Sequence, residues 1–188
     1  MTTQVAPLVV IGIGNILLRD DGVGVRVVEA LERLAAHDRE MLPAATRLVD
    51  GGTLDADLLA VVDGARAVLV IDAVDTAGTP GEVVVLREDA IMAAGARRPG
   101  GRTGGVGELV ALARLMGWLT GPVALVGIQV AEVGFHLGLS PRVEGAIPTA
   151  VETARRTLLQ LDAEAAARCG SAGRQAPSGG ATALEAAR

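Results

Sequence analysis

Acidic residues follow three of the apolar segments in this sequence, and their positions are the ones best suited to chemistry. Asp72, Asp50 and the pair Asp20-Asp21 each come directly after, or shortly after, a short apolar run of the kind that forms a buried strand. The carboxyl ends of parallel strands share one edge of a sheet, and ligands of open α/β folds bind there. Carboxylates held close together repel one another unless a proton or a cation is shared between them. The spacing therefore predicts an acid–base or metal-binding site at one sheet edge.

Each of these residues also has a structural alternative. Asp20 or Asp21 could cap a helix expected to begin at Val23. Asp50 precedes a glycine pair and could serve only to organise a turn. Asp72 is harder to explain structurally, because a charge that follows five apolar strand residues needs a partner.

Other catalytic arrangements are poorly represented. Gly12 and Gly14 follow a strand, as in dinucleotide-binding folds, but the third glycine of that fingerprint is replaced by Leu17. The single cysteine, Cys169, lies beside a segment rich in Gly, Ser, Ala and Pro. Of the two histidines, His37 and His136, the first is expected at the end of a helix; the second follows the last strand and is expected in a loop.

Short apolar runs alternate with helical patterns along the chain. Strands are expected at 8–13, 46–49, 67–71, 82–86 and 123–130. Helices are expected at about 23–36, 54–62, 107–116 and 141–168, with Pro148 kinking or dividing the last. This alternation is typical of βαβ units. It predicts a single-domain α/β three-layer sandwich, in which a twisted, mainly parallel sheet carries helices on both faces.

The domain is expected to span residues 1–169, followed by a flexible tail at 170–188, where the composition turns to small and polar residues. A second loose segment is expected at 95–107, which is too rich in glycine for the interior of a helix or strand.

Composition excludes several classes of partner. All 17 basic residues are arginine, against 22 acidic residues, and the net charge is −5. A negative chain with a single Phe, a single Trp and no Tyr offers neither a basic surface nor a stacking platform for nucleic acid. No apolar run approaches the ~20 residues that span a membrane, and no signal peptide is evident. One cysteine fits a reducing compartment, so a cytoplasmic location is expected.

Four motifs, taken in order, resemble those of the hydrogenase maturation proteases over about residues 8–160. They are Gly12-Ile13-Gly14-Asn15-Ile16-Leu17-Leu18-Arg19-Asp20-Asp21-Gly22-Val23-Gly24, Asp50-Gly51-Gly52-Thr53, Ile71-Asp72-Ala73 and Gly127-Ile128-Gln129. The first motif is fairly specific, and the ordered set is more specific than any single motif.

The resemblance implies an endopeptidase of the aspartic type. Its substrate would be the nickel-loaded large-subunit precursor of a nickel–iron hydrogenase, from which it removes a C-terminal extension. It would hold no permanent cofactor and would recognise the nickel of its substrate transiently. By the same resemblance, Asp21 and Asp72 contact the metal, and Asp21, Asp50 and Asp72 form the catalytic set.

One family feature is missing. The family places a metal-binding histidine just before the helix expected at Gly107, where this sequence has Arg102 and no histidine. Arginine stays protonated and has no acceptor atom, so it cannot replace that ligand. His136 or Glu108 could supply the third ligand, or the chain could belong to a branch with altered metal sensing. The alternative function is therefore a non-proteolytic, metal-sensing chaperone or binding module on the same fold.

Overall fold

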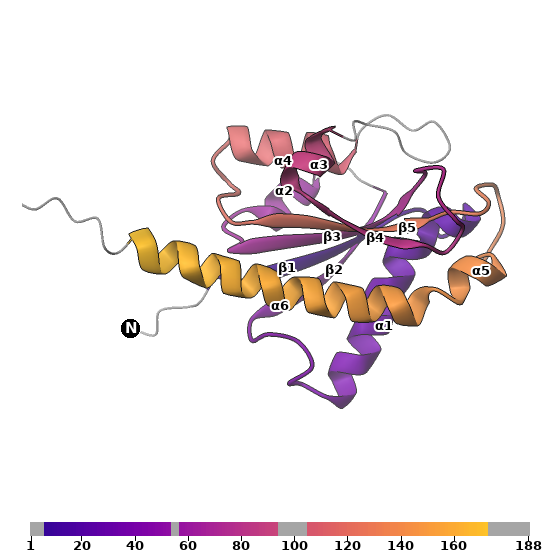
Figure 1. Ribbon diagram of the computed structural model, residues 1–188, viewed down its shortest axis with the longest axis horizontal. Coiled ribbons are helices and arrows are strands. Elements are labelled where there is room, and N and C mark those ends of the chain that lie inside the picture. The colour runs from indigo at the N-terminus through magenta and orange to yellow at the C-terminus, as the bar shows by residue number, and fades with distance from the viewer. Residues whose placement is uncertain (1–5, 54–56, 94–104, 173–188) are drawn as a thin grey trace, which may run out of the picture.

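The computed structural model describes residues 6–53, 57–93 and 105–172, which form one sheet with flanking helices (Figure 1). The strands are β1 (Leu8–Ile13), β2 (Thr46–Gly52), β3 (Ala67–Val74), β4 (Val83–Arg87) and β5 (Val123–Gln129). The helices are the 3-10 helix η1 (Arg19–Gly22), α1 (Val23–His37), α2 (Asp57–Val62), α3 (Glu88–Ala93), α4 (Val106–Leu115), α5 (Pro141–Glu144) and α6 (Ile147–Ala172).

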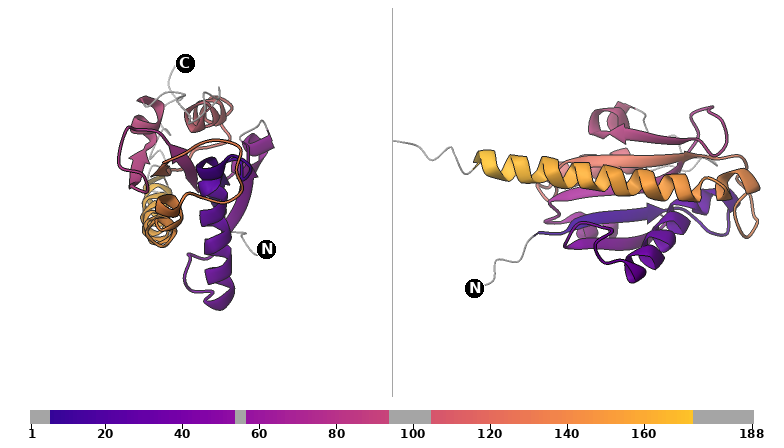
Figure 2. Two further views of the ribbon diagram at one scale, coloured as in Figure 1. Left: turned by 90° about the vertical axis from the view of Figure 1, so that its right-hand side faces the viewer. Right: turned by 60° about the horizontal axis from the view of Figure 1, so that its bottom comes forward.

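The five strands lie in the order β2-β1-β3-β5-β4. The first four run parallel, and β4 pairs with β5 in the antiparallel direction at the edge of the sheet. Helices α1 and α6 cover one face, and α2, α3 and α4 cover the other (Figure 2). The predicted fold class, a mainly parallel α/β sandwich with helices on both faces, is confirmed.

Two apolar clusters fill the space on either side of the sheet. Alternate residues of β3 show how one strand serves both: Leu69 and Ile71 pack with α1 and α6, whereas Val68 and Val70 pack with α2 and α4. A strand covered on both faces needs apolar residues at every position, which explains the continuous apolar runs in the sequence.

Strands β2 and β3 extend further than their apolar runs suggest. Asp50 pairs with Gly12 of β1, and Asp72 pairs with Gly127 of β5, so both residues lie inside strands rather than after them. The sequence prediction ended each strand at its first charged residue, but backbone pairing continues for as long as a neighbouring strand is present. Both aspartates nevertheless lie near the carboxyl edge of the sheet.

The last helical region is divided, as predicted, but the division comes before Pro148. Helix α5 ends at Glu144, and α6 begins at Ile147, so Pro148 occupies the first turn of a new helix, where its missing N–H has no cost. Helix α6 continues to Ala172, past the expected domain boundary at residue 169. The predictions for residues 173–188 and for most of 95–107 fall outside the described residues. Among those that are described, no helix is both long and apolar enough to cross a lipid bilayer.

Candidate active site

Two glycines let the chain turn back tightly at the end of β1. Gly14 has φ +143°, and a Cβ atom there would lie 1.8 Å from the backbone oxygen of Asp21. At Gly24, in the first turn of α1, a Cβ atom would lie 2.2 Å from the backbone oxygen of Ile71. Only glycine permits these two approaches, which place η1 and the start of α1 directly over the ends of β1 and β3.

Asp21 and Asp72 are brought to the same part of this edge. Both side chains are buried, and η1, which carries Asp21, packs against β3, which carries Asp72. The Oδ2 atom of Asp21 accepts a hydrogen bond of 2.9 Å from the backbone N–H of Asn15. The Oδ1 atom of Asp72 accepts one of 2.9 Å from the backbone N–H of Ala73. Buried carboxylates on adjacent segments are an arrangement that can support acid–base or metal chemistry.

Asp50 lies apart from this pair. It is exposed, and its Oδ1 atom accepts a 2.9 Å hydrogen bond from the backbone N–H of Gly52, which forms a local turn. Asp50 pairs in register with Gly12, which faces α1, so Asp50 lies on the face of the sheet that α1 covers. Ile71 packs on that same face, and the next residue of β3, Asp72, therefore points to the opposite face. The geometry therefore favours the turn-forming alternative for Asp50.

Asp20 has a role that the sequence analysis did not anticipate. Its carboxylate accepts four hydrogen bonds: from the backbone N–H groups of Ala131, Glu132 and Ser140, at 2.9, 2.9 and 2.6 Å, and from the Ser140 hydroxyl, at 2.8 Å. The helix-cap alternative is not observed, since Gly22 precedes α1 without a side-chain cap. Asp20 instead fastens residues 131–140 to the loop that follows β1.

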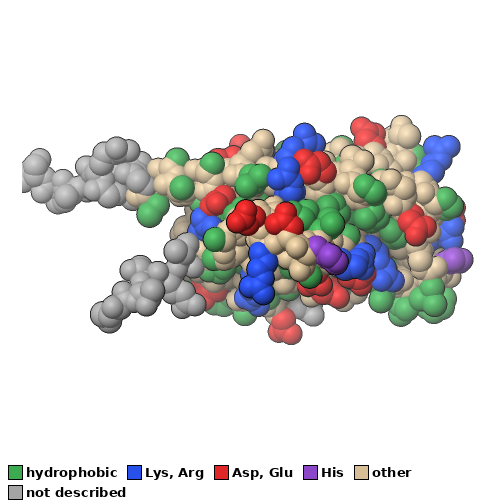
Figure 3. All heavy atoms as spheres, turned by 90° about the horizontal axis from the view of Figure 1, so that it is seen from below, with side chains coloured by type: hydrophobic (Ala, Val, Ile, Leu, Met, Phe, Trp, Pro, Cys, Tyr) green, Lys and Arg blue, Asp and Glu red, His purple; other side chains and the backbone are tan. Residues whose placement is uncertain are grey.

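His136 lies in the loop formed by residues 131–140, as predicted, and its side chain is exposed. Its backbone pairs with the other loop: its N–H donates to Leu17 O at 3.1 Å, and its carbonyl accepts from Arg19 N–H at 3.0 Å. Hydrophobic side chains gather at this end of the molecule (right-hand side of Figure 3). Glu108, the other candidate for a third ligand, is exposed in the first turn of α4, and Arg102 lies outside the described residues.

Gln129 was noticed in the sequence only as part of a motif, but it organises the loop that follows β3. Its buried Oε1 atom accepts hydrogen bonds from the Thr76 backbone N–H at 2.8 Å and the Thr76 hydroxyl at 2.9 Å. Its Nε2 atom lies 3.3 Å from Asp75 Oδ1. The sequence signal that could have identified Gln129 is a polar residue at the end of an otherwise apolar strand. Gln129 therefore holds the chain just beyond Asp72.

Comparison with known proteins places this geometry in a family. Residues 25–157 match the family model HycI, described as hydrogenase maturation protease. The chain belongs to the hydrogenase maturation protease family. It is 40% identical over 153 residues to the hydrogenase expression/formation protein HupD of Rhodobacter capsulatus, covering 80% of this chain and 70% of that protein. It is 32% identical over 162 residues to the hydrogenase 2 maturation protease of Escherichia coli strain K12, covering 86% and 96% of the two chains.

Solved structures agree with this family. The hydrogenase maturating endopeptidase HybD from Escherichia coli superposes with a TM-score of 0.71 at 30% identity, covering 82% of this chain and 93% of that chain. The resemblance read from the four motifs is therefore confirmed, and so is the endopeptidase role in hydrogenase maturation.

Within the described part of the chain, no group of three or more His, Cys, Asp and Glu side chains is arranged to bind a metal ion. Two buried carboxylates alone leave most positions around a metal to other ligands.

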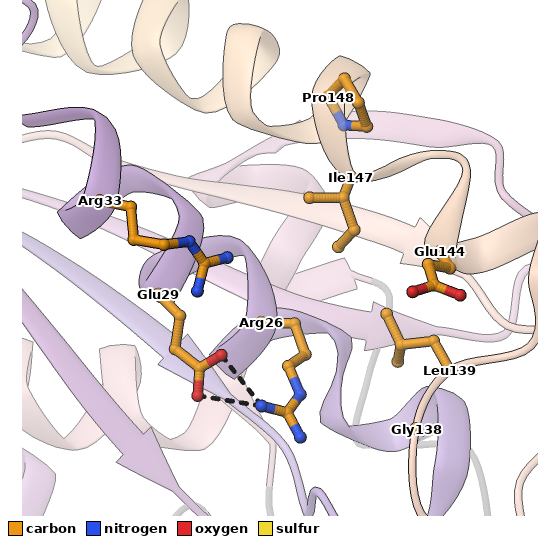
Figure 4. Close-up of a pocket in the computed structure, with 8 residues that line it drawn as sticks. All are labelled: Arg26, Glu29, Arg33, Gly138, Leu139, Glu144, Ile147 and Pro148. Carbon is orange, nitrogen blue, oxygen red and sulfur yellow. Dashed lines mark hydrogen bonds and ion pairs between the residues drawn. The ribbon is translucent and has the colours of Figure 1, made fainter.

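A cavity of about 520 Å³ lies beside the loop of residues 131–140, between α1 and the start of α6 (Figure 4). Its charged lining comes from Arg26, Glu29, Arg33 and Glu144, and Arg26 donates to both carboxylate oxygens of Glu29 at 3.0 and 3.1 Å. Neither Asp21 nor Asp72 lines it, so this cavity is separate from the candidate carboxylates.

Proposed function

We propose that this hydrogenase maturation protease removes the C-terminal extension of a nickel–iron hydrogenase large-subunit precursor after nickel has been inserted. The observation that carries the proposal is the pair of buried carboxylates, Asp21 and Asp72, at the carboxyl edge of two adjacent strands. Membership of the family supplies the reaction class, and the precursor is the partner that this class implies.

Nickel enters the proposal as part of the substrate. The precursor's own cysteines would hold the ion, and Asp21 and Asp72 would complete its coordination, since carboxylate oxygen is a competent ligand for divalent ions. A precursor without nickel lacks this anchor, so it would not be held for cleavage. The protease would thereby test whether the metal has been inserted.

Carboxylates also supply the aspartic-type chemistry that we propose. An aspartate within hydrogen-bond reach of a water molecule accepts its proton while the water oxygen attacks the scissile carbonyl, and a protonated carboxyl returns a proton to the leaving amine. Asp21 and Asp72 are the two candidates for these roles, because both are buried at the edge where ligands of α/β folds bind.

The test is the intact mass of the large-subunit precursor, produced with and without nickel and incubated with the purified protease. We expect a loss of mass equal to a C-terminal peptide only when nickel is present. Asp21→Asn and Asp72→Asn should each abolish processing, because the amide neither accepts a proton nor carries the negative charge that binds the ion.

Asp63→Asn, at an exposed position in the turn after α2, is the control and should process as the wild type does. Full processing by both Asp21→Asn and Asp72→Asn would refute the site. Specific binding of the precursor by the wild type without any loss of mass would instead support the non-proteolytic alternative.

A further inference from the structure

Two neighbouring loops at the carboxyl edge present large apolar side chains to solvent. Phe135 is 88% exposed and Leu137 71% exposed in the loop after β5. Ile16 and Leu17 are 40% and 45% exposed in the loop after β1. We refer to these four residues as the Phe135 patch.

The backbone beneath the Phe135 patch is firmly held. The two loops pair through the parallel bridge between Leu18 and His136. The backbone N–H of Asp20 donates to Glu132 O at 3.3 Å, and the Asp20 carboxylate takes the four hydrogen bonds from residues 131–140. A backbone that is already ordered loses little further conformational entropy when a partner binds, so the backbone of the patch is preorganised for contact.

The charged residues beside the patch are already paired with each other. Arg19 Nε lies 3.2 Å from Glu132 Oε2, and these residues come from the two loops that form the patch. Because this pair carries no net charge, it attracts neither an acidic nor a basic partner. The surface therefore selects a partner that is itself apolar.

The size of the patch argues against a stable dimer. At about 200 Å² for each fully exposed large side chain, the four residues offer roughly 400–500 Å². A stable interface buries about 800 Å² on each partner. A patch of this size is typical of functional surfaces on monomers, and it fits the transient contact between an enzyme and its substrate.

The Phe135 patch lies next to one of the candidate carboxylates. Asn15, whose N–H donates to Asp21 Oδ2, immediately precedes Ile16 and Leu17. A chain segment that reaches Asp21 therefore runs beside the Phe135 patch. We propose that the patch docks apolar side chains of the hydrogenase large-subunit precursor next to the segment that is cleaved, an inference that rests on the proposed function.

The test compares the double variant Phe135→Ala/Leu137→Ala with Leu115→Ala, which removes a side chain that is 83% exposed on α4. Initial rates of processing are measured over a range of nickel-loaded precursor concentrations, and binding to immobilised precursor is measured separately by surface plasmon resonance. We expect the double variant to raise KM and weaken binding at least tenfold, with kcat at saturating precursor and the melting temperature unchanged. Leu115→Ala should match the wild type.

The outcomes separate this proposal from the proposed function. If the wild type cleaves and the double variant equals Leu115→Ala in KM and binding, the docking role is wrong while the protease assignment stands. If the wild type binds through the patch without cleaving, docking stands and the proposed function falls. If ultracentrifugation shows a wild-type dimer that the double variant dissociates, the patch joins copies of this chain and the proposal is overturned.

Discussion

At the scale of single residues, adjacent carboxylates in this chain have different tasks. Asp20 and Asp21 are neighbours in sequence and both are buried, yet they contact different parts of the chain. Asp20 accepts four hydrogen bonds from residues 131–140, whereas the Asp21 carboxylate accepts a hydrogen bond from the Asn15 N–H in its own loop. Residue type and burial alone therefore do not separate a structural aspartate from a candidate catalytic one. Asp20 is identified as structural by its four hydrogen bonds to one distant loop, residues 131–140.

Asp50 provides a test of the same distinction. An asparagine side chain retains the Oδ1 acceptor that receives the Gly52 N–H, but it cannot act as a base. We expect Asp50→Asn to keep processing of the precursor within about threefold of the wild type, a difference of roughly 0.7 kcal/mol or less in transition-state stabilisation. Steady-state processing rates measure this. A loss of activity as large as that of Asp72→Asn would show that the charge of Asp50 takes part in the reaction.

At the scale of elements, Arg114 joins three segments on the face covered by α2, α3 and α4. From the end of α4 its Nε donates to Glu88 Oε1, in the first turn of α3, at 2.7 Å. It also donates to the backbone oxygens of Leu119 and Gly121, which precede β5, at 2.5 and 2.7 Å. One guanidinium thus fixes how α3 and α4 approach the sheet.

This contact predicts a pH dependence of stability. The hydrogen bond from Arg114 lowers the pKa of Glu88 below 4.5, an effect that partial burial opposes and the positive charges of Arg114 and Arg168 reinforce. Because the pKa is lower in the folded state, the contribution is complete above about pH 4.5 and is lost as the pH falls through the folded-state pKa. Glu88→Gln should lower the free energy of unfolding at pH 7 by about 0.5–1.5 kcal/mol, and the difference from the wild type should vanish in acid.

Urea unfolding followed by circular dichroism at several pH values measures this difference. Glu152→Gln is the matched control, because the hydrogen bond from Arg155 also lowers the pKa of Glu152, but that pair on α6 is more exposed than the pair of Arg114 and Glu88. Solvent screens an exposed pair, so the control should lose less stability than Glu88→Gln. Equal losses in the two variants would contradict the role given to Arg114.

The helices and strands that could be predicted from the sequence are those long enough to show a clear pattern of apolar residues. The buried strands and α1 follow from their own residues, and the parallel order explains why Asp21 and Asp72 meet at one edge. Helix α3 was missed because its six residues bury only Ile91, which leaves no periodicity to detect. The role of Asp20 could not be predicted, because its partners lie more than a hundred residues away along the chain.

At the scale of the whole molecule, the Asp20 contacts join the first and last parts of the fold. Asp20→Asn places an NH₂ group where the carboxylate faces only backbone N–H groups and a hydroxyl, so at least one buried donor loses its acceptor. We expect a loss of about 2–4 kcal/mol in the free energy of unfolding, measured by urea denaturation. Asp63→Asn should change it by less than about 0.5 kcal/mol. A variant as stable as the wild type would show that these contacts contribute little.

The separation of Asp20 and Ser140 by 120 residues has a consequence for synthesis on the ribosome. A nascent chain that has emerged through β3 already contains Asp21 and Asp72, but it lacks β5 and the loop that anchors the Asp20 turn. The contacts that anchor the Asp20 turn can therefore form only after the chain has been translated as far as Ser140. An incomplete polypeptide that ends after β3 thus holds both carboxylates without the loop that anchors the Asp20 turn.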